Sequence, residues 1–237
     1  MTIQLRAYDH GRDEPFRAIS SRFFKLCGAL GAVVTDLSTW RGKLGTDSVD
    51  IISERDADGV VVAAARMWRS GDRELVAYGP SARADVKGIA AAKLSMVAGM
   101  APLELPVWVP NQIEIELTGA AEAEMLRDPP RLQAALQALV TAALPAWAVV
   151  SIDGDPRAPV PPFANGAPSV GWMTYLSSAY PPVPSALPQP SVAYEVGPGI
   201  IVVAHPKRPD AGAIERLAYA LADAKVLLPA SHVKPPR

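Results

Sequence analysis

The spacing of apolar and polar residues predicts strands in several parts of the chain. The clearest pattern lies at 112–117, where Ile113, Ile115 and Leu117 would point to one face and polar residues to the other. It is typical of a half-buried strand with an acidic outer face, and Val109-Pro110-Asn111 indicates a turn before it. Further strands are predicted at 3–8, 74–78, 89–98, 147–152 and 199–204.

The stretch at 170–176 alternates large apolar or aromatic residues with small or hydroxylated ones, which predicts another strand. Trp172 and Tyr175 do not fall on the same face of an ideal strand, so we expect at least one of them in the core. There is no charged residue from 158 to 194, and ten prolines lie between 156 and 190, which excludes a helix there. Such a segment is either packed over its neighbours or available to a partner.

Helical spacing begins near Pro15, with Asp13 as the expected cap. The apolar stripe of this helix consists of Phe16, Ile19, Phe23, Leu26 and Leu30. Cys27 lies beside the stripe, and we expect it to be a buried thiol. Gly28 and Gly31 weaken the helix near its end.

A second helix belongs to a run that is long enough to cross a membrane, because residues 132–152 are 21 residues without a charge. Asp128 followed by Pro129 is a helix start signal, however, and Pro145 would end the helix. The run therefore divides into an amphipathic helix and a buried strand that contains Trp147 as a structural residue. We expect no membrane span.

For two segments the sequence is compatible with either a helix or a strand. At 60–68, the three valines favour a strand, while the alanines that follow favour a helix capped near Asp58, and the helix is preferred. At 89–98 we expect a strand, although the alanines at 90–92 would suit a helix equally well.

A last helix begins after Asp210, and its apolar stripe consists of Ile214, Leu217, Ala218 and Leu221. The helices are mixed with hairpin-like groups of strands and do not alternate regularly with them. This order predicts an α+β fold with a largely antiparallel or mixed sheet and packed helices. We expect a single domain over residues 1–228 and a flexible tail over 229–237.

The composition is that of an ordinary globular protein, with 49% hydrophobic and 20% charged residues among 237. The 23 basic and 24 acidic side chains give a net charge of -1, so the basic field that nucleic-acid binders use is absent. A direct nucleic-acid binder is therefore not expected. The amino terminus is charged before any apolar run develops, and there is one cysteine. Both features favour the cytoplasm.

Residues for catalysis are few. The three histidines, His10, His205 and His232, are far apart, and no metal-ligand spacing occurs. Phosphate loops, dinucleotide fingerprints and nucleophile elbows are absent from the sequence. Cys27 would act as a nucleophile only if a histidine approached it in the fold. We therefore expect neither enzymatic activity nor a metal or cofactor.

The order of segments resembles the bacterial immunity protein 52 family, whose members are cytoplasmic antidotes encoded beside polymorphic or type VI secreted toxins. The segments that carry the resemblance are 5–8, 109–111, 113–117, 136–140, 145–150, 171–176 and the strand and helix between 199 and 228. The resemblance implies an α+β fold, no enzymatic activity, and a cognate toxin that is a nuclease of the restriction-endonuclease-like class.

A nuclease groove is expected to be basic, so acidic groups on an inhibitor would steer encounter and imitate phosphates. Acid is concentrated in two places, which give the candidate partner-binding residues Asp47, Asp50, Glu54, Asp56, Asp58, Glu114 and Glu116. The plainer interpretation is that both groups are solvated surface. An alternative function is a cytoplasmic adaptor or chaperone for a secreted effector, docking through the proline-rich stretch, with an enzyme as the third choice. A homodimer is left open.

Overall fold

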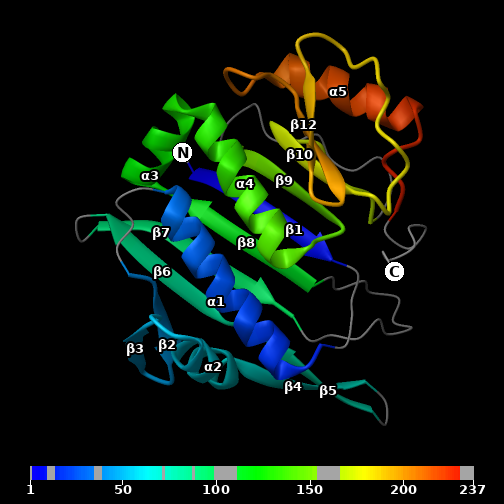
Figure 1. Ribbon diagram of the computed structural model, residues 1–237. Helices are drawn as coiled ribbons and strands as arrows, with labels where there is room; N and C mark the ends of the chain where they lie inside the picture. Colours follow the sequence, from blue (N-terminus) through cyan, green and yellow to red (C-terminus); the bar gives the residue numbers. More distant parts are fainter. Residues whose placement is uncertain are drawn as a thin grey trace.

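The computed structural model describes residues 2–9, 14–34, 39–70, 73–86, 89–98, 111–153 and 166–229 (Figure 1). Its helices are α1 (Phe16–Val33), α2 (Glu54–Ala63), α3 (Gly119–Arg127), α4 (Pro129–Ala143) and α5 (Ala211–Asp223). Its strands are β1 (Thr2–Asp9), β2 (Arg41–Leu44), β3 (Asp47–Asp50), β4 (Ala65–Ser70), β5 (Arg73–Tyr78), β6 (Ser81–Val86), β7 (Ile89–Val97), β8 (Asn111–Leu117), β9 (Trp147–Asp153), β10 (Met173–Ser177), β11 (Val192–Val196) and β12 (Gly199–Val203). The fold is a single α+β domain.

Within the described residues, ten strands form one sheet in the order β11-β12-β10-β9-β1-β8-β7-β6-β2-β3, and β4 pairs with β5 in a separate ribbon. Each neighbouring pair in the sheet is antiparallel. The expectation of a largely antiparallel sheet with packed helices is therefore confirmed.

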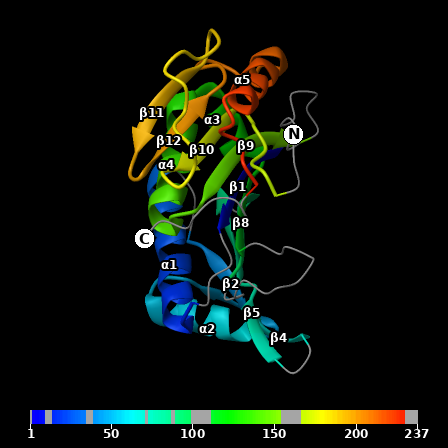
Figure 2. The ribbon, with the colours of Figure 1, turned by 90° about the vertical axis from the view of Figure 1, so that its right-hand side faces the viewer.

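The two faces of the sheet are covered differently. Helices α1 and α4 pack side by side across one face (Figure 1). Figure 2 shows α5 on the opposite side, over the end of the sheet that contains β9, β10 and β12. All five residues of β10 are consequently buried. Over β1, β8, β7 and β6, the face turned away from α1 and α4 carries partly exposed polar side chains, and we call it the open face.

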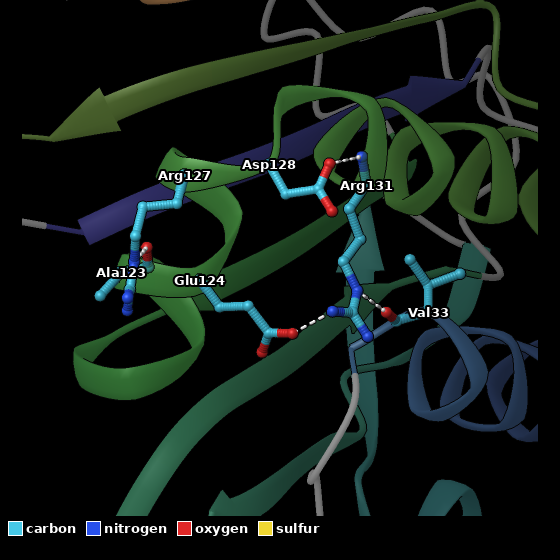
Figure 3. A network of polar contacts seen from close by, with 6 residues as sticks. All are labelled: Val33, Ala123, Glu124, Arg127, Asp128 and Arg131. Carbon is cyan, nitrogen blue, oxygen red and sulfur yellow. Dashed lines mark hydrogen bonds and ion pairs between the residues drawn. The ribbon is translucent and has the colours of Figure 1, made fainter.

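An arginine joins the α3–α4 corner to the end of α1 (Figure 3). Arg131 Nε donates to the carbonyl oxygen of Val33 at 2.7 Å, and its guanidinium also forms an ion pair with Glu124. The last carbonyls of a helix have no partner within it, and a cation is favourable there. Arg131 therefore fixes the position of α1 relative to α3 and α4, at the place where Asp128 caps α4 by accepting from the Arg131 amide.

Several predicted elements are confirmed. Strands are present where we expected them at 3–8, 74–78, 89–98, 112–117, 147–152 and 199–204. Asp128 and Asp210 both accept a backbone hydrogen bond as caps. Cys27 is buried, with 3% of its surface exposed. Each of these signals is local, since it rests on alternation, a cap or an apolar stripe.

Other expectations are corrected. The N-cap of α1 is Pro15 rather than Asp13, and its side chain makes no capping bond. Residues 60–68 divide between α2 and β4, so the preferred helix ends at Ala63. The strand predicted at 170–176 begins only at Met173. The turn at 109–110 and the tail at 230–237 lie outside the described residues.

Candidate functional site

The acidic run at 47–58 divides between two elements at one end of the sheet. Asp47 and Asp50 lie on the edge strand β3, and Glu54, Asp56 and Asp58 lie on α2. Asp47, Asp50 and Glu54 are exposed, while the other two are half-buried. The run therefore forms a small acidic surface around β3 and α2, as the sequence pattern suggested.

Asp56 has a structural role within this surface. The Ser53 hydroxyl donates to Asp56 Oδ2 at 2.7 Å, and the Asp56 amide donates to Ser53 Oγ at 3.3 Å. The Ile52 amide also donates to Asp56 Oδ2, at 3.2 Å. These bonds, above all the one from Ser53, lower the pKa of the Asp56 carboxyl. The Asp56 carboxylate thus satisfies the Ile52 amide, while Ser53, the N-cap of α2, satisfies the Asp56 amide.

The remaining acids of the run have weaker local contacts. Thr46 Oγ1 donates to Asp47 Oδ1 at 3.4 Å, and Ser21 Oγ donates to Glu54 Oε1 at 3.3 Å. Asp50 lies opposite Arg41 in the register of β3 and β2. Contacts at these distances on exposed groups contribute little to stability, so these carboxylates remain available to a partner.

Glu114 and Glu116 project from β8 onto the open face, as the alternation predicted. The structure pairs both with cations on neighbouring strands. Arg6 Nε on β1 lies 2.9 Å from Glu114 Oε1, and Lys93 Nζ on β7 lies 3.5 Å from Glu116 Oε2. This part of the face is therefore a mixed ladder of charges rather than an acidic patch. Strands β7, β6 and β2 separate it from β3, so the two acidic groups are not joined.

A row of cations lies between the two acidic groups, and the sequence pattern did not indicate it. Arg83 on β6 is directly opposite Arg41 on β2 and directly opposite Lys93 on β7. We call these three residues the cation row. They border a cleft of about 360 Å³ that Lys43 and Asp85 also line. The three residues lie far apart in the sequence, so only the strand register brings them together.

The described part of the proline-rich stretch is packed against the end of the sheet. Trp172 and Tyr175 are 1% and 0% exposed, so both belong to the core. Tyr180 is also buried, and loss of hydration raises the pKa of its hydroxyl. Two open grooves of about 370 and 670 Å³ remain beside this segment, and they are lined largely by residues 176–200.

The groups considered for catalysis are not brought together in the described part of the chain. Burial raises the pKa of the Cys27 thiol to about 12, so it is not ionised at neutral pH. His205 Nδ1 accepts from the Lys207 amide at 3.2 Å, while His10 and His232 lie outside the described residues. Among the residues described, His, Cys, Asp and Glu side chains form no cluster suited to a metal ion.

Trp147 is the first residue of β9. It is 5% exposed and stacks on Tyr8 with ring centroids 4.1 Å apart.

The helices of the described chain include none with the length and apolar character needed to cross a membrane.

Comparison with known proteins finds a likeness in fold to a solved structure. Neither a family model nor a curated protein matches the chain. Among solved structures, the chain is similar to the Pseudomonas aeruginosa T6SS protein PA0821, with a TM-score of 0.50 and 11% sequence identity. The matched region covers 93% of this chain and 75% of that chain. The likeness is one of fold, and it places nearly the whole chain in the same α+β architecture as a T6SS protein.

Proposed function

We propose that this chain is an immunity protein of the immunity protein 52 family. It binds and neutralises a cognate secreted nuclease toxin of the restriction-endonuclease-like class, and so protects the producing cell and its siblings. The observation that carries the proposal is the likeness in fold to a T6SS protein over 93% of the chain. The order of segments in the sequence favours the same function.

The surface supports binding to a protein rather than catalysis. Charged side chains of both signs are arranged on the open face and around β3 and α2. The one cysteine is buried and protonated at neutral pH. We therefore infer a protein without enzymatic activity, which acts in the cytoplasm, where a nuclease toxin would meet nucleic acid.

The acidic surface around β3 and α2 is the proposed site of contact with the toxin groove. Its exposed carboxylates are Asp47, Asp50 and Glu54, with Asp58 beside them. They would attract the basic groove that a nuclease uses for its polyanionic substrate, which speeds encounter and fixes orientation. Asp56 is left out of this contact because its carboxylate is engaged at the start of α2.

Co-expression with the toxin gene encoded beside this chain tests the proposal. Cells that produce the toxin alone should stop growing and show degraded DNA or RNA, and cells that also produce this chain should grow. An unrelated nuclease toxin serves as the control and should remain lethal. If the neighbouring toxin kills cells with and without this chain, although both proteins accumulate, the immunity function is wrong.

The grooves beside the proline-rich segment favour an adaptor or chaperone as the second candidate. Both grooves have Glu195 as the one charged residue of their lining, and such a surface is suited to an extended segment of an effector. The two functions predict different results in the same cells. A chaperone would raise the amount of toxin or its export while leaving the toxin active, whereas an immunity protein would protect cells without changing export.

A further inference from the structure

The cation row is unfavourable for the fold by itself. Side chains directly opposite each other on neighbouring strands have Cβ atoms about 5 Å apart, and like charges at that distance repel. Arg83 faces a cation on each side, Arg41 on β2 and Lys93 on β7. A sequence selected only for stability would place a neutral or acidic residue at position 83. The arrangement therefore requires an explanation outside the fold.

The ion pairs in the structure involve the two ends of the row and not its centre. Arg41 forms an ion pair with Asp85, and Lys93 forms one with Glu116. Arg83 is exposed and has no ion pair within the described part of the chain. A negative group brought by a partner would meet Arg83 between two cations that already have counter-charges.

The local geometry leaves room for such a group. Gly42 faces α2, where a Cβ atom would lie 2.5 Å from Val60 Cγ2, so its neighbours Arg41 and Lys43 point to the opposite side of β2. Lys43 lines the cleft of about 360 Å³ together with the cation row. The rest of the lining is mostly small, with Ser48, Ser81 and Ala82. A cleft of this size suits one or two side chains.

The charges around the cleft favour carboxylates of a protein over a nucleic acid. The row crosses three strands and is therefore only about 10 Å long. Acidic residues border it on both sides, Asp50 beyond Arg41 and Glu116 beyond Lys93. A nucleic-acid backbone would continue past the row and meet these carboxylates, while the net charge of -1 offers it no wider attraction.

We propose that the cation row is a docking site for a short acidic segment of a protein partner, whose carboxylates insert beside Arg83. This inference rests on the proposed function, in which the partner is the cognate toxin. It adds that the toxin has two contact surfaces. An acidic segment of the toxin binds the open face, and its basic groove binds the surface around β3 and α2. Adjacent surfaces of opposite charge would fix the register of the complex and exclude partners with another pattern.

Binding of a fluorescein-labelled hexaglutamate peptide tests the site without the toxin. At low salt the parent chain should bind the peptide, and Arg83→Glu should weaken binding about tenfold or more, since it reverses the central charge. Lys25→Glu is the matched control, because Lys25 is exposed on α1, on the covered side of the sheet. It should bind within about twofold of the parent.

Thermal melting separates a docking role from a structural one. Arg83→Glu places a carboxylate between two cations, so its Tm should equal or exceed that of the parent by up to about 3 °C. If the melting temperature falls instead, Arg83 supports the fold and the docking site is wrong. The same holds if the parent does not bind hexaglutamate, or if Arg83→Glu binds it as the parent does.

A labelled single-stranded oligothymidine of similar length identifies the class of partner. If the oligonucleotide binds more tightly than hexaglutamate, the proposal that the partner is a protein segment is wrong. Failure of the proposed function would look different, because cells would then die in the co-expression experiment while the peptide still bound through Arg83. If a variant chain that does not bind the peptide still protects cells, the docking site is wrong and the immunity function stands.

Discussion

The side chain of Trp172 joins the start of β10 to the coil that follows β12. It is 1% exposed, and its indole Nε1 donates to the carbonyl oxygen of His205 at 2.8 Å. It precedes β10, whose Tyr175 is completely buried. An ideal strand would place only one of these two rings in the core. Both are buried because helices and the proline-rich coil cover this end of the sheet on its two sides.

Trp172→Ala should lower the free energy of unfolding by about 3 to 5 kcal/mol, through the cavity it leaves and the carbonyl it deprives of a donor. Urea denaturation measures the loss. Tyr194→Ala is the control, because Tyr194 is 40% exposed and its removal should change stability by less than about 0.5 kcal/mol. Equal unfolding midpoints for Trp172→Ala and the parent would show that Trp172 is not a core residue.

Cys27 should be dispensable for function and should make stability depend on alkaline pH. The pKa of the thiol is raised from 9.0 to about 12 in the folded chain, so the unfolded chain loses this proton first. Its contribution to stability is complete below pH 9 and is lost as the pH rises toward 12. Between about pH 8 and 10.5 the parent should lose up to about 2 kcal/mol more than Cys27→Ala.

The comparison with Cys27→Ala is needed because buried Tyr175, with its pKa raised to about 12, titrates in the same direction. Protection of cells by Cys27→Ser gives the functional measurement, and it should match that of the parent. A folded Cys27→Ser chain that no longer protects would instead support an enzymatic role for the thiol.

At the scale of elements, the contact between β9 and the chain entering β10 depends on a glycine. A Cβ atom on Gly171 would lie 2.3 Å from the Val150 carbonyl oxygen and 2.5 Å from Val149 Cγ2. Gly171→Ala should therefore lower stability by about 1 to 3 kcal/mol or more, because backbone must move. Gly28→Ala on α1 meets nothing within 4 Å and should raise stability by up to about 1 kcal/mol. Chemical denaturation measures the free energy of unfolding of both variants. If it falls in both or rises in both, this packing is contradicted.

Elements with a strong local signal could be predicted from the sequence, and elements held by their neighbours could not. Strand β8 has three buried apolar residues alternating with polar ones, and α4 and α5 have aspartate caps. Strands β2 and β3 have four residues each and are mostly exposed, so their pattern is too short to detect. They are strands because each pairs with a neighbour. The N-cap of α1 is Pro15 rather than Asp13, because the fixed φ angle of proline suits that position.

For the whole molecule, the candidate site was predicted in part. The sequence shows where acid is dense, and the structure keeps that density around β3 and α2. It does not show that Arg6 and Lys93 pair with the acids of β8 or that Arg83 lies between two cations. These relations depend on strand register between distant segments. The α+β class could be predicted because it rests only on the order of the elements.

Reversing two acids tests whether the surface around β3 and α2 steers the toxin. Asp50→Lys combined with Glu54→Lys should slow association with the purified toxin and reduce the dependence of the association rate on salt. The double variant should lose up to about 1 kcal/mol of stability, because Asp50→Lys places a cation opposite Arg41. Asp56 is left unchanged because its carboxylate is bonded to Ser53, the N-cap of α2. Glu215→Lys with Asp223→Lys on the exposed face of α5 is the control.

Stopped-flow binding gives the association rates. Parental kinetics for the Asp50→Lys and Glu54→Lys chain would exclude acidic steering by this surface. The grooves beside the proline-rich segment would then be the next place to map the contact.

The most direct test of the central claim is a titration of the toxin's nuclease activity with the purified chain. Immunity by binding predicts that the activity falls in proportion to the chain added and disappears when each toxin active site has its bound chain. The double lysine variant should reach the same end point more slowly. Undiminished cleavage of nucleic acid by a toxin saturated with this chain would contradict the account.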